Sequence, residues 1–543
     1  MLGNRLSHEW AGRPATRVPF RIGKRLTALI YVLLGVAAVI PLGVTDIPLL
    51  VDFPNHLARI HIMANVAQDA ALSANYGVRW GVVPNLAFDI FAIPFYGLLP
   101  VETVGRLFIL VVFVMLVGGT LALRRVVYGR VDLWTTAVFL FLYNHLLIMG
   151  FLNYLFGVGL ALLLFAGWIA SRSLPPAIRL SLFSAAVIVL FFCHVFALVV
   201  YAISVGSYEI STRYRDLREG WLDVARHWLF GAMQFVPLAI LVLATMPDPQ
   251  GGELVYGTFV QKLRAAWSPT LTYQKPVDLA LMAFVVGVLA VGLVRRRFGL
   301  APQLRGPLLV LALLAVIMPF WVRGAWGSVA YSDLRLPLVV ALLMVAGLEL
   351  RDVKRETLFA LGCAAGVLFG ARIIDMTMEW QRTDRELSEF RAAITVIPKG
   401  VAVLPVQVRN AHLKTGVPRF EYAYWHLAAL AVIDRSVFMP FLFTDPAKQP
   451  VRASAARKAI DAPFGAPLDY NFLHTGMEDG TRQPDDDGNI YTDRPFWSDW
   501  PARYDYLLLT HFGARDNPAP SILEPVQEGS FFTIFRIIAP PAH

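Results

Sequence analysis

The stretch from Leu26 to Val44, LTALIYVLLGVAAVIPLGV, is a continuous apolar run that directly follows a basic N-terminus. A hydrocarbon layer about 30 Å thick is crossed by roughly 20 apolar residues in a helix, so this run is long enough for one crossing. It is too long for the apolar part of a typical secretory signal, and no small-residue cleavage site follows it where one is needed. We therefore predict a retained first span with its N-terminus in the cytoplasm, the side that basic residues favour.

Many further apolar runs follow the first one. The chain is 57% hydrophobic and 16% charged, which is too apolar for a soluble protein of 543 residues. The run 178–210 is long enough for two short spans that meet near Cys193 and His194. The sequence therefore predicts a mainly α-helical, multi-pass protein of the cell membrane with about eleven transmembrane helices. The other predicted spans lie near 104–123, 133–149, 151–170, 227–245, 277–294, 306–321, 335–350 and 356–373.

The apolar run 84–100 is ambiguous, because it is short and contains Pro84, Asp89 and Pro94. We place it in the membrane interface as an interfacial helix rather than across the membrane. With that choice, the large basic clusters all lie on the cytoplasmic side, as the positive-inside rule requires. The first outside loop then covers about 45–103, and everything after residue 374 is extracytoplasmic. The clusters are Arg124/Arg125/Arg130, Arg172/Arg179, Arg213/Arg215/Arg218/Arg226, Arg295/Arg296/Arg297/Arg305 and Arg351/Lys354/Arg355.

The tail, residues 375–543, differs in character from residues 1–374 and predicts a small extracytoplasmic α/β domain. Its β-branched and aromatic runs indicate strands, and two segments have a helical pattern. The polar stretch 464–500 is predicted as loop, and its aspartates at 485–487 lack the ligand spacing of a calcium loop. The predicted strands are 401–405, 504–509 and 531–537, and the predicted helices are 379–395 and 449–461.

The charge and cysteine content exclude some classes of partner. The net charge is +9, but the basic residues lie in short clusters between apolar runs, so orientation in the membrane explains them better than a nucleic-acid partner. The two cysteines, Cys193 and Cys363, lie in separate apolar runs, so no disulfide framework is predicted. No pair of histidines recurs at a ligand spacing on one helix, so no metal site is predicted.

The first outside loop contains the motif DFPNHLAR, from Asp52 to Arg59, which opens a predicted amphipathic helix running to about Asp69. At 100° per residue, Asp52, His56 and Arg59 fall on one face of this helix. Polar residues at membrane depth are costly and often functional, so these three are candidate site residues. A structural alternative stays open for Asp52, because Asp followed by Pro two residues later also favours a helix N-cap.

Other polar residues gather on the same predicted side of the membrane. Asp46 precedes Pro48, where a turn-forming role is the default. His194 either binds a ligand or is a satisfied core histidine. An arginine at the interface either binds a phosphate group or extends its charge to water. The candidates of this group are Asp46, Asn153, His194, Glu253, Tyr256, Arg323 and Arg335.

This arrangement resembles the GT-C superfamily of polytopic glycosyltransferases, which includes the aminoarabinose and protein mannosyl transferases. The segment Asp52 to Arg59 is similar to the acidic motif and helix of that family's first outside loop, and Pro84 to Ile90 resembles its second interfacial helix. Arg335-Leu336-Pro337 resembles an arginine-containing entry to a late span. One departure is that many members have two adjacent acids in the first loop, whereas Phe53 follows Asp52 here, so the second acid's role is vacant or is filled by Asp46 or another loop.

The resemblance implies transfer of a sugar from a polyprenyl-phosphate donor to a glycan, lipid or protein acceptor of the cell envelope. Asp52 would act as general base toward the acceptor hydroxyl, with Asp46 as the other candidate acid. Arg335, Arg323 and His56 would stabilise the leaving phosphate. Transfer by one displacement would invert the anomeric carbon. Some members use a divalent metal and others none, and the residues favour neither.

Two other classes of function stay open. A transporter of lipids or solutes predicts polar residues near the middle of the membrane and broken helices related by a repeat, and neither is evident in the sequence. A non-enzymatic subunit of polysaccharide assembly or export is compatible with the same residues. In each case the membrane lipids are the immediate surroundings of the chain.

Overall fold

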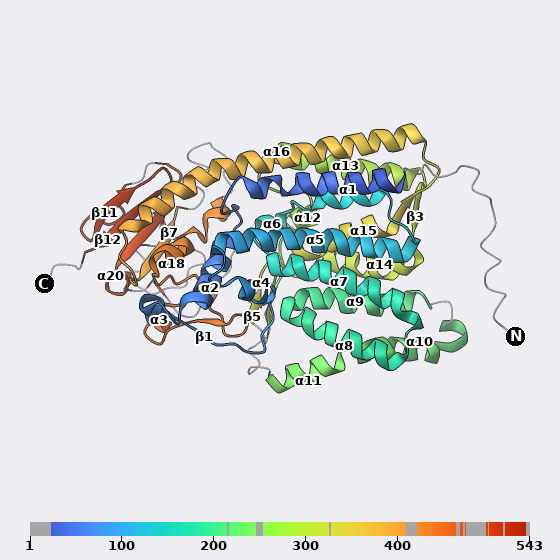
Figure 1. Cartoon of the computed structure of the whole chain (residues 1–543), viewed down its shortest axis with the longest axis horizontal. Helices are drawn as coiled ribbons and strands as arrows, with labels where there is room; N and C mark the ends of the chain where they lie inside the picture. Colours follow the sequence, from blue (N-terminus) through green and yellow to red (C-terminus); the bar gives the residue numbers. More distant parts are fainter. Residues whose placement is uncertain are drawn as a thin grey trace.

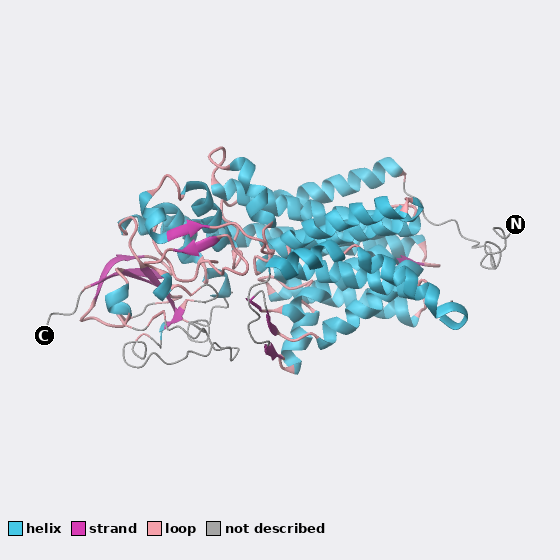
Figure 2. Cartoon of the chain, turned by 90° about the horizontal axis from the view of Figure 1, so that it is seen from below, coloured by secondary structure: helices cyan, strands magenta, loops and turns pink. Residues whose placement is uncertain are grey.

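The computed structural model is mainly helical, with a bundle of long helices at one end and a mixed helix and strand region at the other (Figure 1). Most of the strands lie toward the end of the molecule where the C-terminus is marked (Figure 2). The predicted loop 464–500 and its aspartates fall almost entirely outside the described residues. The structure describes residues 23–213, 217–245, 253–324, 327–408, 421–462, 467–470, 473, 496–497, 499–513 and 516–538.

Six helices in the described part of the chain are long and apolar enough to cross a membrane. A seventh span results if α10 (Leu217–Met233) and α11 (Val236–Thr245), which meet at a 50° bend, are counted together. The predicted count of about eleven is therefore not confirmed. The six are α1 (Lys24–Val39) with the 3-10 turn η1 (Ile40–Gly43), α5 (Val101–Tyr128), α7 (Leu152–Ala170) with η4 (Ser171–Ser173), α8 (Pro176–Cys193), α13 (Lys275–Val294) and α16 (Arg355–Ala393) with η6 (Ile394–Val396).

The remaining predicted spans form shorter helices. The run 133–149 is divided into η3 (Leu133–Phe141) and α6 (His145–Ile148). The division occurs at Asn144, whose side-chain oxygen accepts hydrogen bonds from the backbone of Leu146 and Leu147 and so starts a new helix. The others are α9 (Val195–Ser211), α14 (Pro302–Ile317) and α15 (Ser332–Gly347).

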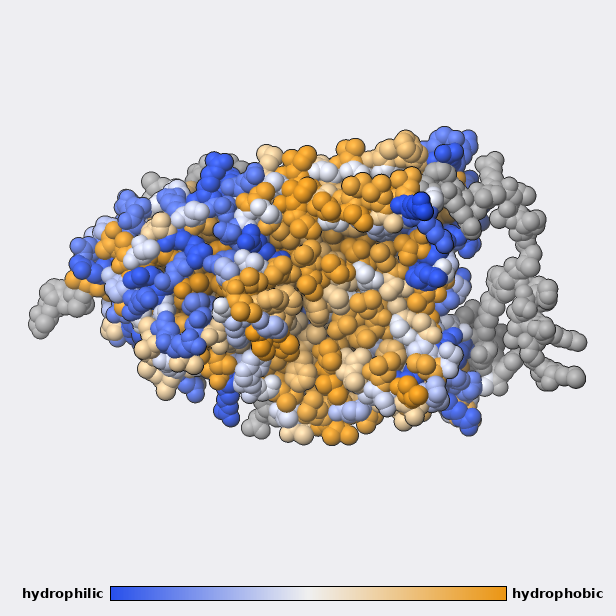
Figure 3. All heavy atoms as spheres, in the orientation of Figure 1, coloured by the Kyte–Doolittle hydropathy of each residue, from blue (hydrophilic) through white to orange (hydrophobic). Residues whose placement is uncertain are grey.

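The surface of the helical bundle carries a broad apolar band between two polar ends (Figure 3). Large side chains of the candidate spans, such as Leu33, Val36 and Val367, are exposed. An exposed apolar belt of this extent marks a surface that contacts lipid. The chain is therefore consistent with a membrane protein, as the sequence predicts.

Close packing inside the bundle depends on glycine. The helices α5 and α7 cross where Gly119 faces Gly159. A Cβ atom on Gly159 would lie 2.5 Å from the backbone of Met115, so no side chain fits there. Small residues at such crossings allow helices to approach closely in a membrane, where burial of apolar surface alone does not drive association.

The first outside loop contains α2 (Phe53–Asn65), α3 (Ala70–Asn75), β1 (Tyr76–Val78), α4 (Ala87–Ala92) and the turn η2 (Ile93–Phe95). The run 84–100 therefore forms only short helical pieces, none long enough to cross a membrane. The predicted helix to about Asp69 instead ends at Asn65, and Asp69 caps α3 by accepting from Ala71 and Leu72.

The tail contains a five-stranded sheet of order β11-β12-β10-β7-β9. Strands β7 and β10 are parallel, and β10 and β12 are antiparallel. The three predicted strands correspond to β7, β10 and β12. The bounds are β7 (Val403–Gln407), β9 (Leu468–Asp469), β10 (Tyr506–Thr510), β11 (Leu523–Glu528) and β12 (Phe532–Ile537), with helices η7 (Glu421–Tyr424), η8 (Leu427–Ala429), α18 (Leu430–Arg435) and α20 (Trp500–Arg503).

The predicted helix 449–461 is wrong. This segment contains strand β8 (Val451–Ala453) and the 3-10 turn η9 (Lys458–Ile460). Strand β8 pairs with β1 of the first outside loop, with Gly77 opposite Arg452. A pairing between segments so distant in sequence overrides the local helical pattern.

The helix α16 joins the bundle to the tail without a break (Figure 1). The predicted span 356–373 and the predicted helix 379–395 are parts of this one helix. The predicted boundary between residues 374 and 375 therefore falls inside a continuous helix, because no glycine or proline interrupts it there. The tail is tied to the bundle by α16 and by the β1–β8 pair.

Smaller elements complete the bundle. The sheet β2-β4-β5 lies close in the chain to α12 (Phe259–Ala266) and α15. The pair β3-β6 joins the start of α14 to the end of α15, where Arg130 contacts Glu349. The bounds are β2 (Glu253–Val255), β3 (Phe298–Leu300), β4 (Trp321–Gly324), β5 (Gly327–Val329) and β6 (Leu348–Leu350).

Candidate functional site

Asp52 directly precedes α2, at the N-cap position, but its side chain does not cap the helix. Its backbone has helical dihedral angles, φ −83° and ψ −7°, rather than the extended ones of most N-caps. Its backbone N–H donates to the carbonyl of Met149 at 3.2 Å, which ties the start of α2 to the loop after α6. The carboxylate of Asp52 is therefore left for other contacts.

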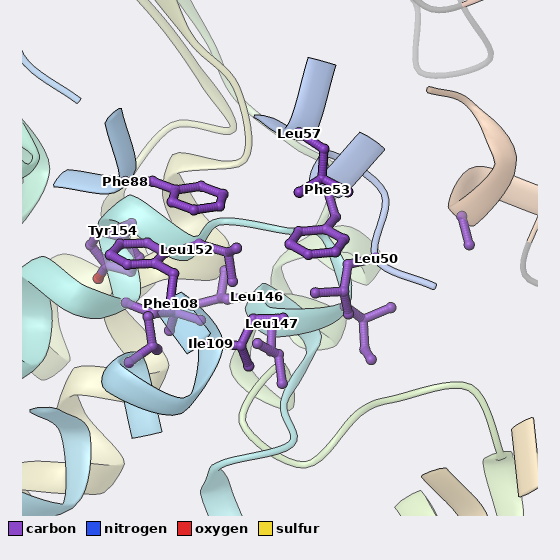
Figure 4. Close-up of a cluster of buried hydrophobic side chains, with 14 of the residues drawn as sticks. Leu50, Phe53, Leu57, Phe88, Phe108, Ile109, Leu146, Leu147, Leu152 and Tyr154 are labelled. Carbon is purple, nitrogen blue, oxygen red and sulfur yellow. The ribbon is translucent and has the colours of Figure 1, made fainter. Parts of the chain in front are cut away.

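The residues that flank Asp52 in the chain belong to a cluster of buried apolar side chains (Figure 4). Leu50 and Phe53 are both fully buried in it. The rings of Phe88 and Phe108 stack with their centroids 4.5 Å apart. Such a core holds the backbone of Asp52 in one position. The cluster joins α2, α4, α5, α6 and α7 through Leu50, Phe53, Leu57, Phe88, Phe108, Ile109, Leu146, Leu147, Leu152 and Tyr154.

Gly150 makes direct backbone contact with Asp52. It has φ +79°, a left-handed conformation that favours glycine. A Cβ atom at this position would lie 2.7 Å from the backbone nitrogen of Asp52 and 2.8 Å from its Cβ. Gly150 therefore fixes how closely Asp52 approaches the loop after α6.

Replacing Gly150 by alanine is expected to displace Asp52 and to lower the thermal stability of the protein. Gly97→Ala is the matched control, because Gly97 also has a left-handed φ, of +71°, but has open space around its Cβ position. Both variants lose about 1 kcal/mol to backbone strain. We expect Gly150→Ala to lose a further amount of about 1 to 3 kcal/mol of folding stability, which is the usual cost of inserting an extra group into a packed core. Thermal unfolding of the purified protein measures this difference. Equal losses would contradict a contact with Asp52.

The carboxylate of Asp52 is largely enclosed, with 19% of its side chain exposed. Burial raises its pKa from 3.8 to about 7, although Arg335 and Arg59 act in the opposite direction. A carboxyl group with a pKa near neutrality is well matched to accept a proton at physiological pH. Its remaining exposure leaves a path for a ligand.

Arg335 lies near the start of α15, close enough to Asp52 for its charge to favour the ionised carboxylate. Its guanidinium lies over the ring of Phe151, 4.4 Å from the centroid, and donates to the carbonyl of Ala330 at 3.3 Å. Its Nε is buried and has no hydrogen-bond partner within the described part of the chain. Among the described residues, no carboxylate oxygen lies within 4 Å of it. A buried cation without an anionic partner is costly, so this site is suited to an anion supplied by a ligand.

The tail supplies residues that the sequence did not indicate. His426, at the start of η8, places its Nε2 3.6 Å from Oδ1 of Asp52. The ring of Phe443 contacts both His426 and His56, with centroid distances of 5.6 Å and 5.4 Å. Lys448 lies close enough to Arg335 for the charge of Arg335 to contribute to lowering its pKa, which burial and this charge bring to about 8. The site therefore lies between the bundle and the tail.

The predicted residues His56 and His194 lie near this site. His56 is buried, and burial holds its pKa well below its ordinary value, so its ring is neutral. His194 lies between α8 and α9, where its Nδ1 accepts from the backbone N–H of Phe196 at 3.1 Å. Its ring contacts Tyr154 edge to face. His194 therefore caps α9, as a satisfied core histidine does.

Arg59 and Asn153 are engaged with other protein groups. Arg59 forms a two-pronged ion pair with Asp89, with bonds of 2.7 and 2.8 Å, and neither side chain is exposed. Asn153 accepts from the backbone of Phe88 and donates to Asn85. These contacts hold the segment around α4 against α2 and α7. We assign both residues a structural role.

The other predicted residues lie apart from Asp52. Asp46 is 75% exposed and lies 3.3 Å from Arg106. Tyr256 is exposed just after β2. Glu253 and Arg323 are opposite each other in the β2–β4 register, and their side chains fall outside the described structure. Of the ten predicted site residues, the structure brings together Asp52, His56, His194 and Arg335.

A cavity of about 2770 Å³ lies among α1, η3, α12, α13, α14, α15 and α16. Near the site it is lined by Lys262, Trp267 and Pro337, and Lys262 contacts Asp333 at the start of α15. At the other end of α15 it is lined by Arg351 and Arg355. Pockets for small ligands are roughly 300 to 1,000 Å³, so this space suits a long lipid chain.

No group of three metal-binding side chains occurs in the part of the chain that the structure describes. Comparison with known proteins gives no family: no family model, no curated protein and no solved structure matches the chain. The arrangement of Asp52, Arg335, His426 and Lys448 is therefore the basis for any statement about function.

Proposed function

We propose that this chain is a membrane glycosyltransferase that moves a sugar from a polyprenyl-phosphate donor to an extracytoplasmic acceptor. The observation that carries the proposal is that a partly exposed carboxylate, Asp52, lies within the electrostatic reach of a buried guanidinium, Arg335, which forms no ion pair with any described carboxylate. One group suits proton removal from an acceptor, and the other suits a departing phosphate.

In the proposed reaction, an acceptor hydroxyl oxygen attacks the anomeric carbon of the sugar. The hydroxyl proton passes to the carboxylate of Asp52, and the bond from the anomeric carbon to the phosphate oxygen breaks. The phosphate leaves with the bonding electrons and is stabilised by Arg335, with Lys448 nearby. A single displacement of this kind inverts the anomeric carbon. Because Asp52 must be ionised, and burial raises its pKa to about 7, activity should rise with pH through neutrality.

The cavity among the helices supports a lipid-linked donor. Its head end is lined by Lys262 and by Pro337, which lies within one helical turn of Arg335 along α15, although Arg335 itself is not part of the lining. A polyprenyl chain in this cavity would end near the level of Arg335 along α15, and its phosphate would extend beyond the cavity lining to reach the guanidinium. The lipid carrier would be a substrate, and no metal is needed for the steps assigned to Asp52 and Arg335.

The topology that fits this function has the tail on the extracytoplasmic side of the cell membrane. The basic residues Arg130, Arg297, Arg351 and Arg355 lie at the end of the bundle opposite the tail. The positive-inside rule places that end in the cytoplasm. The shorter helices η3 with α6, α9, α14 and α15 would then cross together with the longer ones, which gives the eleven crossings of the sequence prediction.

Arg335→Gln is expected to lower the rate of sugar transfer at low donor concentration by about 10²-fold or more, as the loss of one charge-stabilising donor does in other enzymes. The measurement uses membranes that contain the full chain and a polyprenyl-phosphate donor carrying a labelled sugar. Arg106→Gln is the control, because Arg106 contacts the exposed Asp46 instead. An Arg335→Gln variant as active as wild type would contradict the assigned role.

A lipid transporter is a second candidate, which the size of the cavity favours. The two functions differ in their need for Asp52. Asp52→Asn should abolish sugar transfer but leave the movement of a labelled lipid across a vesicle membrane unchanged. Lipid movement without any sugar transfer in the wild type would favour the transporter.

A further inference from the structure

The contacts of Asn55 determine the orientation of its amide. Its Nδ2 lies 2.8 Å from the carbonyl oxygen of Phe441, which accepts but cannot donate a hydrogen bond. The atom facing that oxygen must therefore be nitrogen. The same nitrogen lies 2.9 Å from Nδ1 of His426. Its second hydrogen is thus donated to the histidine ring.

This orientation determines the tautomer of His426. Since Nδ1 accepts a hydrogen bond from Asn55, it carries no proton. Burial lowers the pKa of His426 to about 3, so the ring is neutral at pH 7. A neutral imidazole keeps one proton, which is then on Nε2. That nitrogen faces Oδ1 of Asp52 at 3.6 Å, a few tenths of an ångström beyond a hydrogen bond.

Few other groups act on the carboxylate of Asp52. The charged ones are Arg335 from α15 and Arg59 from α2, and both favour the ionised form. His56 from α2 is neutral. Only two described side chains thus add charge near Asp52, and one of them, Arg59, is already paired with Asp89. A directed N–H from His426 would hold one carboxylate oxygen and leave the other for a substrate.

We propose that His426 of the tail is a positioning residue, whose Nε2–H donates to Oδ1 of Asp52 and orients Oδ2 toward the acceptor hydroxyl. The proposal rests on the proposed function. It gives the tail a defined part in the reaction, since Asn55 at the start of α2 and the carbonyl of Phe441 hold the imidazole in place. In apo structures such hydrogen bonds are often long, and they shorten when substrate binds.

Two substitutions separate the two nitrogen contacts of His426. In His426→Gln, the amide nitrogen occupies the place of Nε2, so the donor to Asp52 is kept and the contact with Asn55 is lost. In His426→Asn, the amide oxygen occupies the place of Nδ1, so the contact with Asn55 is kept and the donor to Asp52 is lost. His426→Phe removes both and keeps the ring volume.

The first readout is the pH profile of sugar transfer by membranes that contain the full chain. A donor to the carboxylate favours its ionised form, so loss of the donor raises the pH at which activity appears. We expect His426→Asn and His426→Phe to reduce the rate at pH 7 about ten- to hundredfold. The acidic limb of the pH profile, where activity rises as Asp52 ionises, should move to higher pH by about one unit. His426→Gln should restore the wild-type limb.

The second readout does not depend on activity. Infrared spectroscopy of the purified full chain follows the protonated carboxyl band of Asp52, which is assigned by its absence in Asp52→Asn. The band should persist to higher pH in His426→Asn than in the wild type or His426→Gln. In either readout, wild-type behaviour of His426→Asn together with altered behaviour of His426→Gln would overturn the proposal. The role of His426 would then be to hold Asn55 through Nδ1.

The two readouts also separate this inference from the function on which it rests. An infrared shift with no sugar transfer by the wild type would overturn the glycosyltransferase function and leave the contact with Asp52 in place. The wild type could also transfer sugar while all three His426 variants keep the wild-type pH profile and the wild-type infrared band of Asp52. That result would overturn the positioning role alone.

Discussion

Replacing Arg59 by methionine is expected to destabilise the folded protein by about 3 to 5 kcal/mol, the usual cost of removing one partner from a buried ion pair. Arg59 and Asp89 bond at 2.7 and 2.8 Å, and neither side chain is exposed. The change leaves the carboxylate of Asp89 buried without its partner. Methionine keeps most of the side-chain volume, so packing changes little. The free energy of unfolding in mild detergent, measured with denaturant, tests this.

The double variant Arg59→Met, Asp89→Leu is the control. It removes both charges together, and apolar replacements of a buried ion pair are often neutral or stabilising. We expect it to recover most of the lost stability and to transfer sugar. If Arg59 instead binds the donor phosphate, Arg59→Met would stay stable and lose activity, and the double variant would stay inactive.

The apolar runs of the sequence predict most of the helices, because a membrane helix needs only a local run of apolar residues. The break in 178–210 was located correctly at His194, where the histidine side chain starts α9. The run 133–149 does not form a regular span, because Asn144 competes for backbone hydrogen bonds, and hydropathy does not detect this.

Only part of the candidate site could be predicted from the sequence, and the reason lies in sequence distance. The sequence singles out Asp52 and Arg335 because ionisable residues are unusual near apolar spans. His426 and Lys448 belong to the tail, and contacts between segments distant in sequence bring them to the site, among them the pairing of β1 with β8 and the packing of α18 and η8 on α2. The helical pattern of α2 predicted one polar face, whereas the structure encloses Phe53 to Ile60 on all sides.

Asp52→Asn is expected to reduce sugar transfer by about 10² to 10⁴-fold, the contribution of a general base. Asparagine has the same shape but cannot take the acceptor proton. The fold should not suffer. Because burial raises the pKa of Asp52 from 3.8 to about 7, the ionised carboxylate lowers stability as pH rises between these values. The variant should therefore be at least as stable as the wild type at pH 8, so lost activity cannot be attributed to unfolding.

The most direct test compares transfer of labelled sugar from a polyprenyl-phosphate donor by membranes containing the wild type, Asp52→Asn or Asp46→Asn. Asp46 is the matched control, because it is an aspartate of the same loop that is exposed and contacts Arg106 rather than the site. We predict transfer by the wild type and by Asp46→Asn, and almost none by Asp52→Asn. Full activity of Asp52→Asn, or loss of activity in Asp46→Asn alone, would contradict the assignment of Asp52 as the base.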